Sequence, residues 1–200
     1  MRKITAGLFI SLDGIVADPQ DWHFPYYNDE MGEAVSALVA TADTLLFGRV
    51  TYDSFAGAWP EREAAGAEDA GFAKALGDLR KIVFSRRELD FTWRNSEQHR
   101  GDLVATAAAL KAEPGGDISL SGSTSIVRQL LAAGLIDELH LFVHPIALRS
   151  DGLRLFDEGT PIPLRLLSAA PFKSGVLHLI YGPADAPEEA GYEDARAYLA

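Results

Sequence analysis

The sequence predicts an α/β protein whose central sheet is mostly parallel, carries helices on both faces and ends in an antiparallel hairpin. Apolar runs of strand length alternate with stretches of helical period along most of the chain. Two further strand-like runs, 164–172 and 175–181, follow each other almost directly, which is typical of a hairpin. Because 200 residues suit one domain, we expect a domain over residues 1–182 and an acidic tail over 183–200.

The predicted strands are short apolar runs that begin and end beside turn-forming residues. The first of them stops at a turn from Ser11 to Gly14, and the short third strand stops at Ser85. In chain order, the expected strands are 4–10, 44–47, 81–84, 91–94, 117–121, 137–145, 164–172 and 175–181.

The predicted helices combine a capping residue with one apolar face. Asn28 is a suitable N-cap, and the residues after it have acids in the first turn and apolar residues at helical spacing. Gly134 is placed to end a later helix. The expected helices are 29–41, one after Gly48 that contains Tyr52 and Phe55, 72–79, 102–111 and 126–133.

Two segments show no clear period. Residues 61–71 are rich in Ala, Gly and Glu, and we predict a mobile loop there. The tail beyond Pro183 is strongly acidic, and we predict that it is solvated, with one helical turn near Tyr198.

Composition excludes several classes of partner and site. The chain has 29 acidic and 18 basic residues and a net charge of −11, which argues against nucleic-acid and anionic-membrane binding. It has no cysteine, hence no disulfide or thiolate metal site. No apolar run approaches the roughly 18 residues of a membrane span, and the N-terminal apolar run resembles a buried strand more than a secretory leader. We therefore expect a cytoplasmic protein.

His140 and His144 lie on one face of a predicted strand. Four residues apart on a strand, they are roughly 13 Å from each other, too far to share a zinc ion. We expect no metal site there, and a core or dimer-facing position for both histidines.

Three predicted strand ends carry residues suited to a bound phosphate. They are 48–51 (GRVT), 85–87 (SRR) and 121–125 (SGSTS). Ligands of open α/β sheets bind beyond such strand ends, where helix N-termini present free N–H groups and where glycine allows close backbone approach. Arginine and hydroxyl side chains add donors. Turn formation alone suffices to explain any one segment, whereas the three together favour a phosphorylated nucleotide. Neither a GxGxxG nor a P-loop motif occurs.

Several of these segments resemble motifs of one known group of proteins. Residues 44–52 (TLLFGRVTY) resemble the strand and G-R-x-T-[WY] motif of dihydrofolate reductases, and 82–86 (IVFSR) resemble their next strand. The S-L-D-G at 11–14 and the LLAAGLIDEL at 130–139 resemble the reductase domain of the bifunctional riboflavin-biosynthesis deaminase-reductase. Over residues 3–181 the chain resembles the stand-alone dihydrofolate-reductase-like family related to that domain.

The resemblance implies a three-layer dihydrofolate-reductase-like fold, NADPH as cofactor and a homodimer formed through 137–145. It places 12–17 as a loop over the nicotinamide, Arg49 and Thr51 at the cofactor phosphates, Ser85 and Arg86 near the 2′-phosphate, and 122–125 around the pyrophosphate. An arginine near a ribose phosphate also favours NADP over NAD. The implied cofactor-binding residues are Ile15, Ala17, Gly48, Arg49, Thr51, Ser85, Arg86, Gly122, Ser123, Thr124 and Ser125.

The substrate side of the expected site is aromatic. Trp22 and Pro25 resemble the W-x-x-P before the folate-binding helix, but Tyr27 stands where that family has its catalytic carboxylate. We predict Trp22, Phe24 and Tyr52 as substrate-binding residues, with ordinary packing as the alternative role of these aromatics. Asp13 and Tyr27 are the candidate catalytic residues.

Asp13 has two possible roles, proton relay or capping of its own turn. The proton needed in the reaction has four possible sources, namely Asp13, Tyr27, His23 or an ordered water. The expected function is an NADPH-dependent reductase that transfers a hydride to a small heteroaromatic or conjugated substrate, pterin-like or pyrimidine-like. The alternative is a non-catalytic NADP(H)-binding or flavin-binding module.

Overall fold

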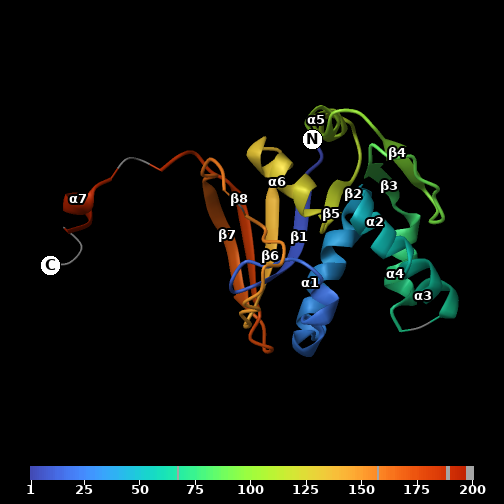
Figure 1. The fold of residues 1–200 in the computed structure, drawn as a ribbon, viewed down its shortest axis with the longest axis horizontal. Helices are drawn as coiled ribbons and strands as arrows, with labels where there is room; N and C mark the ends of the chain where they lie inside the picture. Colours follow the sequence, from blue (N-terminus) through green and yellow to red (C-terminus); the bar gives the residue numbers. More distant parts are fainter. Residues whose placement is uncertain (67, 157, 188–189, 197–200) are drawn as a thin grey trace.

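The computed structural model describes every residue except 67, 157, 188–189 and 197–200 (Figure 1). The described residues form an eight-stranded sheet in the order β4-β3-β2-β5-β1-β6-β8-β7. The first six strands are parallel to one another, whereas β8 is antiparallel to both β6 and β7. The strands are β1 (Ile4–Ser11), β2 (Ala42–Gly48), β3 (Arg80–Phe84), β4 (Ser96–His99), β5 (Asp117–Ser121), β6 (Glu138–His144), β7 (Leu164–Pro171) and β8 (Leu177–Pro183).

Helices cover both faces of this sheet and make a three-layer sandwich. The α-helices are α1 (Asp29–Ala40), α2 (Arg49–Ala56), α3 (Trp59–Ala65), α4 (Ala70–Asp78), α5 (Leu103–Ala112), α6 (Thr124–Ala132) and α7 (Tyr192–Arg196). Helices α1 to α4 supply the apolar residues packed on one face, and α5 and α6 supply those on the other. Two short 3₁₀ helices, η1 (Pro19–Asp21) and η2 (Phe24–Tyr26), lie between β1 and α1. The predicted fold class is confirmed.

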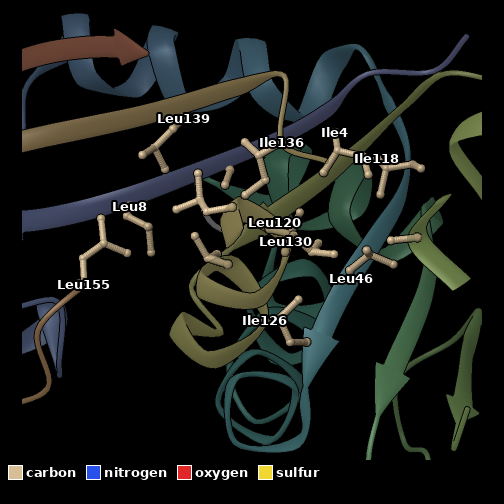
Figure 2. Packing of buried hydrophobic residues seen from close by; sticks show 14 of the residues in the cluster. Ile4, Leu8, Leu46, Ile118, Leu120, Ile126, Leu130, Ile136, Leu139 and Leu155 are labelled. Atoms are coloured by element: carbon tan, nitrogen blue, oxygen red, sulfur yellow. The ribbon is translucent and has the colours of Figure 1, made fainter. Parts of the chain in front are cut away.

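Alternation along β1 explains the layers. Ile4 and Leu8 pack into the core beneath α5 and α6, which Figure 2 shows with Ile126 and Leu130 of α6. Phe9, the residue after Leu8, packs on the other face, beside α1. Gly7 lets α1 approach this face closely, because a Cβ atom there would be 2.7 Å from Leu38 Cδ1. The side-chain period of two therefore divides β1 between two cores.

The predicted strand at 91–94 is wrong. That segment is a loop whose Trp93 is buried, and the strand is β4, Ser96–His99. Because β4 is an edge strand with four polar residues, it has no apolar alternation to recognise.

The predicted mobile loop at 61–71 is also wrong over most of its length. Helix α3 continues to Ala65 and ends at Gly66, which has a left-handed φ of 63°, and α4 begins at Ala70. Ala and Glu are strong helix formers, so the composition taken for a loop is equally suited to a helix. Residue 67 lies outside the described residues.

The predicted dimer surface at 137–145 is wrong. Strand β6 lies inside the sheet, hydrogen-bonded to β1 on one edge and β8 on the other. Its side chains from Leu139 to Phe142, and that of His144, are buried. His140 and His144 therefore occupy the core position that was one of their two expected roles.

Beyond β8, α7 lies apart from the sheet (Figure 1). The predicted helical turn near Tyr198 lies outside the described residues. The short α7 (Tyr192–Arg196), which ends two residues before Tyr198, is the helix described in the tail. Among the described residues, no helix has the length and apolar character needed to cross a bilayer.

Candidate functional site

The candidate site lies at the edge of the sheet where the parallel strands end. Ser121 ends β5, Ser11 ends β1 and His144 ends β6, and these strands are neighbours in the sheet. Gly48 ends β2 on the other side of β5. Helices α2 and α6 begin directly after Gly48 and Ser123, so their N-termini open at this same edge.

Two reciprocal hydrogen bonds join these helix N-termini. The backbone N–H of Gly48 donates to Ser123 Oγ at 2.8 Å, and the backbone N–H of Ser123 donates to Thr51 Oγ1 at 3.0 Å. Each hydroxyl thus accepts from the other segment, and its own hydrogen remains to be donated. We call Gly48, Thr51 and Ser123 the clasp. It sets two helix N-termini and two hydroxyl donors side by side, an arrangement suited to an anion.

The backbone before α6 takes an unusual conformation. Gly122 has a φ of 80° and Ser123 a φ of 56°, both in the left-handed region. A Cβ atom on Gly122 would also lie 3.2 Å from Thr51 Cγ2. Glycine is therefore required at 122 both by the backbone angle and by the close approach of α2.

The other predicted cofactor residues lie on the segments that follow β1, β2, β3 and β5. Arg49 is partly exposed and pairs with Asp53 at 2.8 Å, one turn further along α2. Ser85 follows β3, and its hydroxyl closes the local turn by donating to Arg87 O at 2.9 Å and accepting from Arg87 N at 3.1 Å. Arg86, between them, is exposed.

The predicted residues after β5 and β1 differ in exposure. Thr124 is buried and Ser125 is exposed, both in the first turn of α6. Ile15 is buried, and Ala17 O accepts from the Trp22 indole N–H at 3.0 Å.

An aromatic group lies beside the ends of β1 and β6. Trp22, His23, Tyr26 and Phe9 each have their ring centroid within 6.1 Å of that of His144. His23 also stacks on Phe9 at 4.5 Å. Sequence reasoning had not predicted that Phe9 and His144 join the loop aromatics, because the β1–β6 pairing that brings them together is not local.

The two histidines of this group are uncharged near neutral pH. Burial lowers the pKa of His23 to about 4, and burial also lowers the pKa of His144. His144 Nδ1 donates to Phe142 O at 2.8 Å, which leaves Nε2 as the acceptor nitrogen of the ring. Among the described residues, neither His144 Nε2 nor His23 Nδ1 has a hydrogen-bond partner, although both atoms are buried.

The remaining predicted substrate and catalytic residues divide between two places. Phe24, 58% exposed, and Tyr27, 48% exposed, lie at the solvent side of the aromatic group. Partial burial raises the pKa of Tyr27. Tyr52 is not brought to this group. It is buried with Phe91 and Trp93 in a separate cluster, where its hydroxyl accepts from Trp93 N at 3.3 Å.

Asp13 is tied to two other segments. Its carboxylate accepts from Ser11 Oγ at 2.6 Å, from Leu148 N at 3.1 Å and from Arg149 N at 2.9 Å. The Ser11 hydroxyl, followed by the Arg149 amide, lowers the pKa of Asp13 to about 2. Asp13 is therefore ionised at neutral pH and holds no proton to donate.

Comparison with known proteins agrees with this architecture. The uncharacterized protein YyaP of Bacillus subtilis is 29% identical over 184 residues, which cover 90% of this chain and 94% of YyaP. A pyrimidine reductase-like protein of Corynebacterium diphtheriae has a similar fold, with a TM-score of 0.67 at 17% identity, over 92% of this chain and 93% of that one.

A longer structural neighbour comes from Thermotoga maritima. It is a diaminohydroxyphosphoribosylaminopyrimidine deaminase/5-amino-6-(5-phosphoribosylamino)uracil reductase, with a TM-score of 0.62 at 15% identity. The similarity covers 92% of this chain and 57% of that protein. At such identities the two neighbours show the fold alone. The RibD C-terminal domain family matches residues 2–178, nearly the whole chain, and the chain therefore belongs to the RibD C-terminal domain family.

Proposed function

We propose that the chain is an NADPH-dependent reductase that transfers a hydride to a small heteroaromatic or conjugated substrate, pterin-like or pyrimidine-like. The observation that carries the proposal is the clasp, which aims two helix N-termini and two hydroxyl donors at one place in a RibD C-terminal domain. The two fold neighbours described as a reductase or reductase-like support the same class of reaction. When bound, NADPH supplies the hydride from C4 of its nicotinamide ring.

The residues present fit the phosphates of such a cofactor. The Thr51 and Ser123 hydroxyl oxygens accept from backbone N–H groups. A hydroxyl can donate at the same time, so each can offer its hydrogen to a phosphate. Arg49 donates one Nη1 hydrogen bond to Asp53 and keeps other guanidinium donors for a phosphate. We propose that 122–125 hold the pyrophosphate, that Arg49 adds positive charge, and that Ser85 and Arg86 bind the 2′-phosphate.

The aromatic group provides the substrate end of the proposed site. Its buried rings exclude water from one side, and Phe24 offers an exposed ring to a flat heterocycle. The low pKa of Asp13 removes it as the proton source near pH 7, and His23 is neutral and buried. We therefore propose that the proton comes from water or from Tyr27, which is protonated and half exposed.

A titration with NADPH and NADH tests the cofactor. We expect NADPH to bind more tightly than NADH and Arg49→Ala to weaken NADPH binding about tenfold, the effect of one charge-assisted contact. The matched control is Arg80→Ala, which removes another arginine with one carboxylate partner, but at the N-terminal end of β3. Absence of binding by either nucleotide contradicts the proposal.

Turnover is then tested by screening pteridines, pyrimidines and quinones for oxidation of NADPH. NADPH binding without oxidation in the presence of any of them supports the non-catalytic module instead. If the purified protein is yellow and has a flavin spectrum, the bound group is a flavin and not NADPH.

We also propose that two copies associate through the β7–β8 hairpin. Leu166, Leu167 and Leu177 are each at least 42% exposed there, and β7 is the edge strand of the sheet. An exposed apolar edge strand is typical of a pairing surface.

A cytoplasmic location remains a prediction from the sequence.

A further inference from the structure

Asp13 fills a backbone anion site made by this chain itself. The successive N–H groups of Leu148 and Arg149 point at its two carboxylate oxygens, Leu148 N at Oδ1 and Arg149 N at Oδ2. Arg149 has a left-handed φ of 54°, a conformation uncommon for a residue with a side chain. Successive amides that converge in this way form a concave site for an anion, which we call the 148–149 nest.

The rest of this region is held by contacts that do not involve the carboxylate. Leu12 N donates to Ile146 O at 2.8 Å, Val16 N to Leu153 O at 2.9 Å, and Leu155 N to Gly14 O at 3.0 Å. These backbone bonds fix the two ends of segment 146–155 against the turn after β1. The middle of the segment, at the 148–149 nest, is held to that turn through the Asp13 side chain.

Two arginines brace this region by donating to backbone carbonyl oxygens, and they do not contact the Asp13 carboxylate in these bonds. Arg154 donates to the backbone oxygen of Asp13, and Arg128 of α6 donates to Leu155 O at 2.8 Å. Both contacts are made by donors to carbonyl oxygens, so the carboxylate of Asp13 remains available to the two amides. The hydroxyl of Ser11 fixes that carboxylate from the other side at 2.6 Å.

We infer that Asp13 is a positioning residue whose carboxylate fills the 148–149 nest and so holds segment 146–155 as a fixed wall of the site. Because the nest is already occupied by this carboxylate, an anionic substituent of the substrate is excluded from it. This inference rests on the proposed function for the identity of the site. The turn that carries Asp13 lies beside the aromatic group, because Ser11 at the end of β1 pairs with His144 at the end of β6. The substrate class that fits is a heterocycle without a phosphate at this end.

Amide hydrogen exchange measured by NMR on the full chain tests the inference. We expect Asp13→Ala to speed exchange at Leu148 and Arg149 by about tenfold or more, with the neighbouring backbone bonds intact. Asp21→Ala, which removes an exposed acid from η1, is the matched control and leaves both amides unchanged. Unchanged exchange in Asp13→Ala overturns the inference.

Titration with inorganic phosphate separates this role from a merely structural one. The vacated nest of Asp13→Ala should gain phosphate-dependent shifts at the Leu148 and Arg149 amides, and the parent protein should show none. If Asp13→Ala does not fold, Asp13→Asn serves, because one carbonyl oxygen protects one amide and leaves the other exchanging freely. Phosphate shifts in the parent protein, or full protection of both amides in Asp13→Asn, contradict the inference. If the parent protein does not bind NADPH, the proposed reductase function is overturned, whereas the exchange and phosphate results for the Leu148 and Arg149 amides still decide the role of Asp13.

Discussion

Ser123 Oγ accepts the backbone N–H of Gly48 at 2.8 Å, across 75 residues of sequence. This bond joins the end of β2 to the start of α6, and its partner from Ser123 N to Thr51 Oγ1 closes the clasp. The consequence is that two helices begin at one place, with their positive ends together.

Removing the Ser123 hydroxyl should open the clasp. Ser123→Ala leaves Gly48 N without its acceptor, and we expect a loss of about 1 kcal/mol in the free energy of unfolding. NADPH binding should weaken with it, because the N-termini lose their alignment. Urea unfolding and an NADPH titration measure both effects. Ser54→Ala, on an exposed position of α2, is the control, and equal stability of the two variants contradicts the prediction.

A pair of glycine variants isolates the close contact at Gly122. Gly122 and Gly134 both have left-handed φ values, 80° and 65°, but a Cβ atom meets Thr51 only at Gly122. Replacement by alanine should cost about 1 kcal/mol at both positions for the backbone angle. We expect a larger loss for Gly122→Ala in thermal unfolding. Equal losses would mean that α2 yields to the extra methyl group.

Stability should fall in mild acid because buried histidines resist protonation. In the folded chain, burial lowers the pKa of His23 and of His178 to about 4 each, against 6.5 in the unfolded chain. As the pH falls from 7 toward 4, the unfolded state takes up protons first, so the free energy of unfolding decreases. His23→Phe should weaken this pH dependence by up to about 3 kcal/mol between pH 7 and 4. Urea midpoints at the two pH values measure it, and an unchanged slope in His23→Phe argues against the burial of His23.

The proposed dimer predicts a mass of about 43 kDa, twice that of one chain of 21.6 kDa. Leu166→Glu introduces a charge on the exposed edge strand β7 and should shift the mass to that of one chain in light scattering. Leu12→Glu, at a 65% exposed position in the turn after β1, should not. A parent protein of 21.6 kDa rules out this association.

Most of the fold was predictable because its signals are local. Apolar runs, the Asn28 cap and the small-residue turns each report on a few neighbouring residues, and the structure confirms the cap, with Asn28 accepting from Met31 N. The failures have local causes too. Strand β4 lacks an apolar pattern at its edge position, and α3 has a composition that suits loop and helix alike.

The candidate site divides in the same way. The sequence by itself determined that glycine, hydroxyl and arginine residues follow several strands, and parallel strands bring their carboxyl ends to one edge whatever the details of packing. Only the tertiary structure decided that Thr51 contacts Ser123 and that His144 packs near His23. It also decided that the Asp13 carboxylate accepts hydrogen bonds from amides 135 and 136 residues away. Such contacts depend on strand order and register, which place distant residues together and leave no trace in local periodicity.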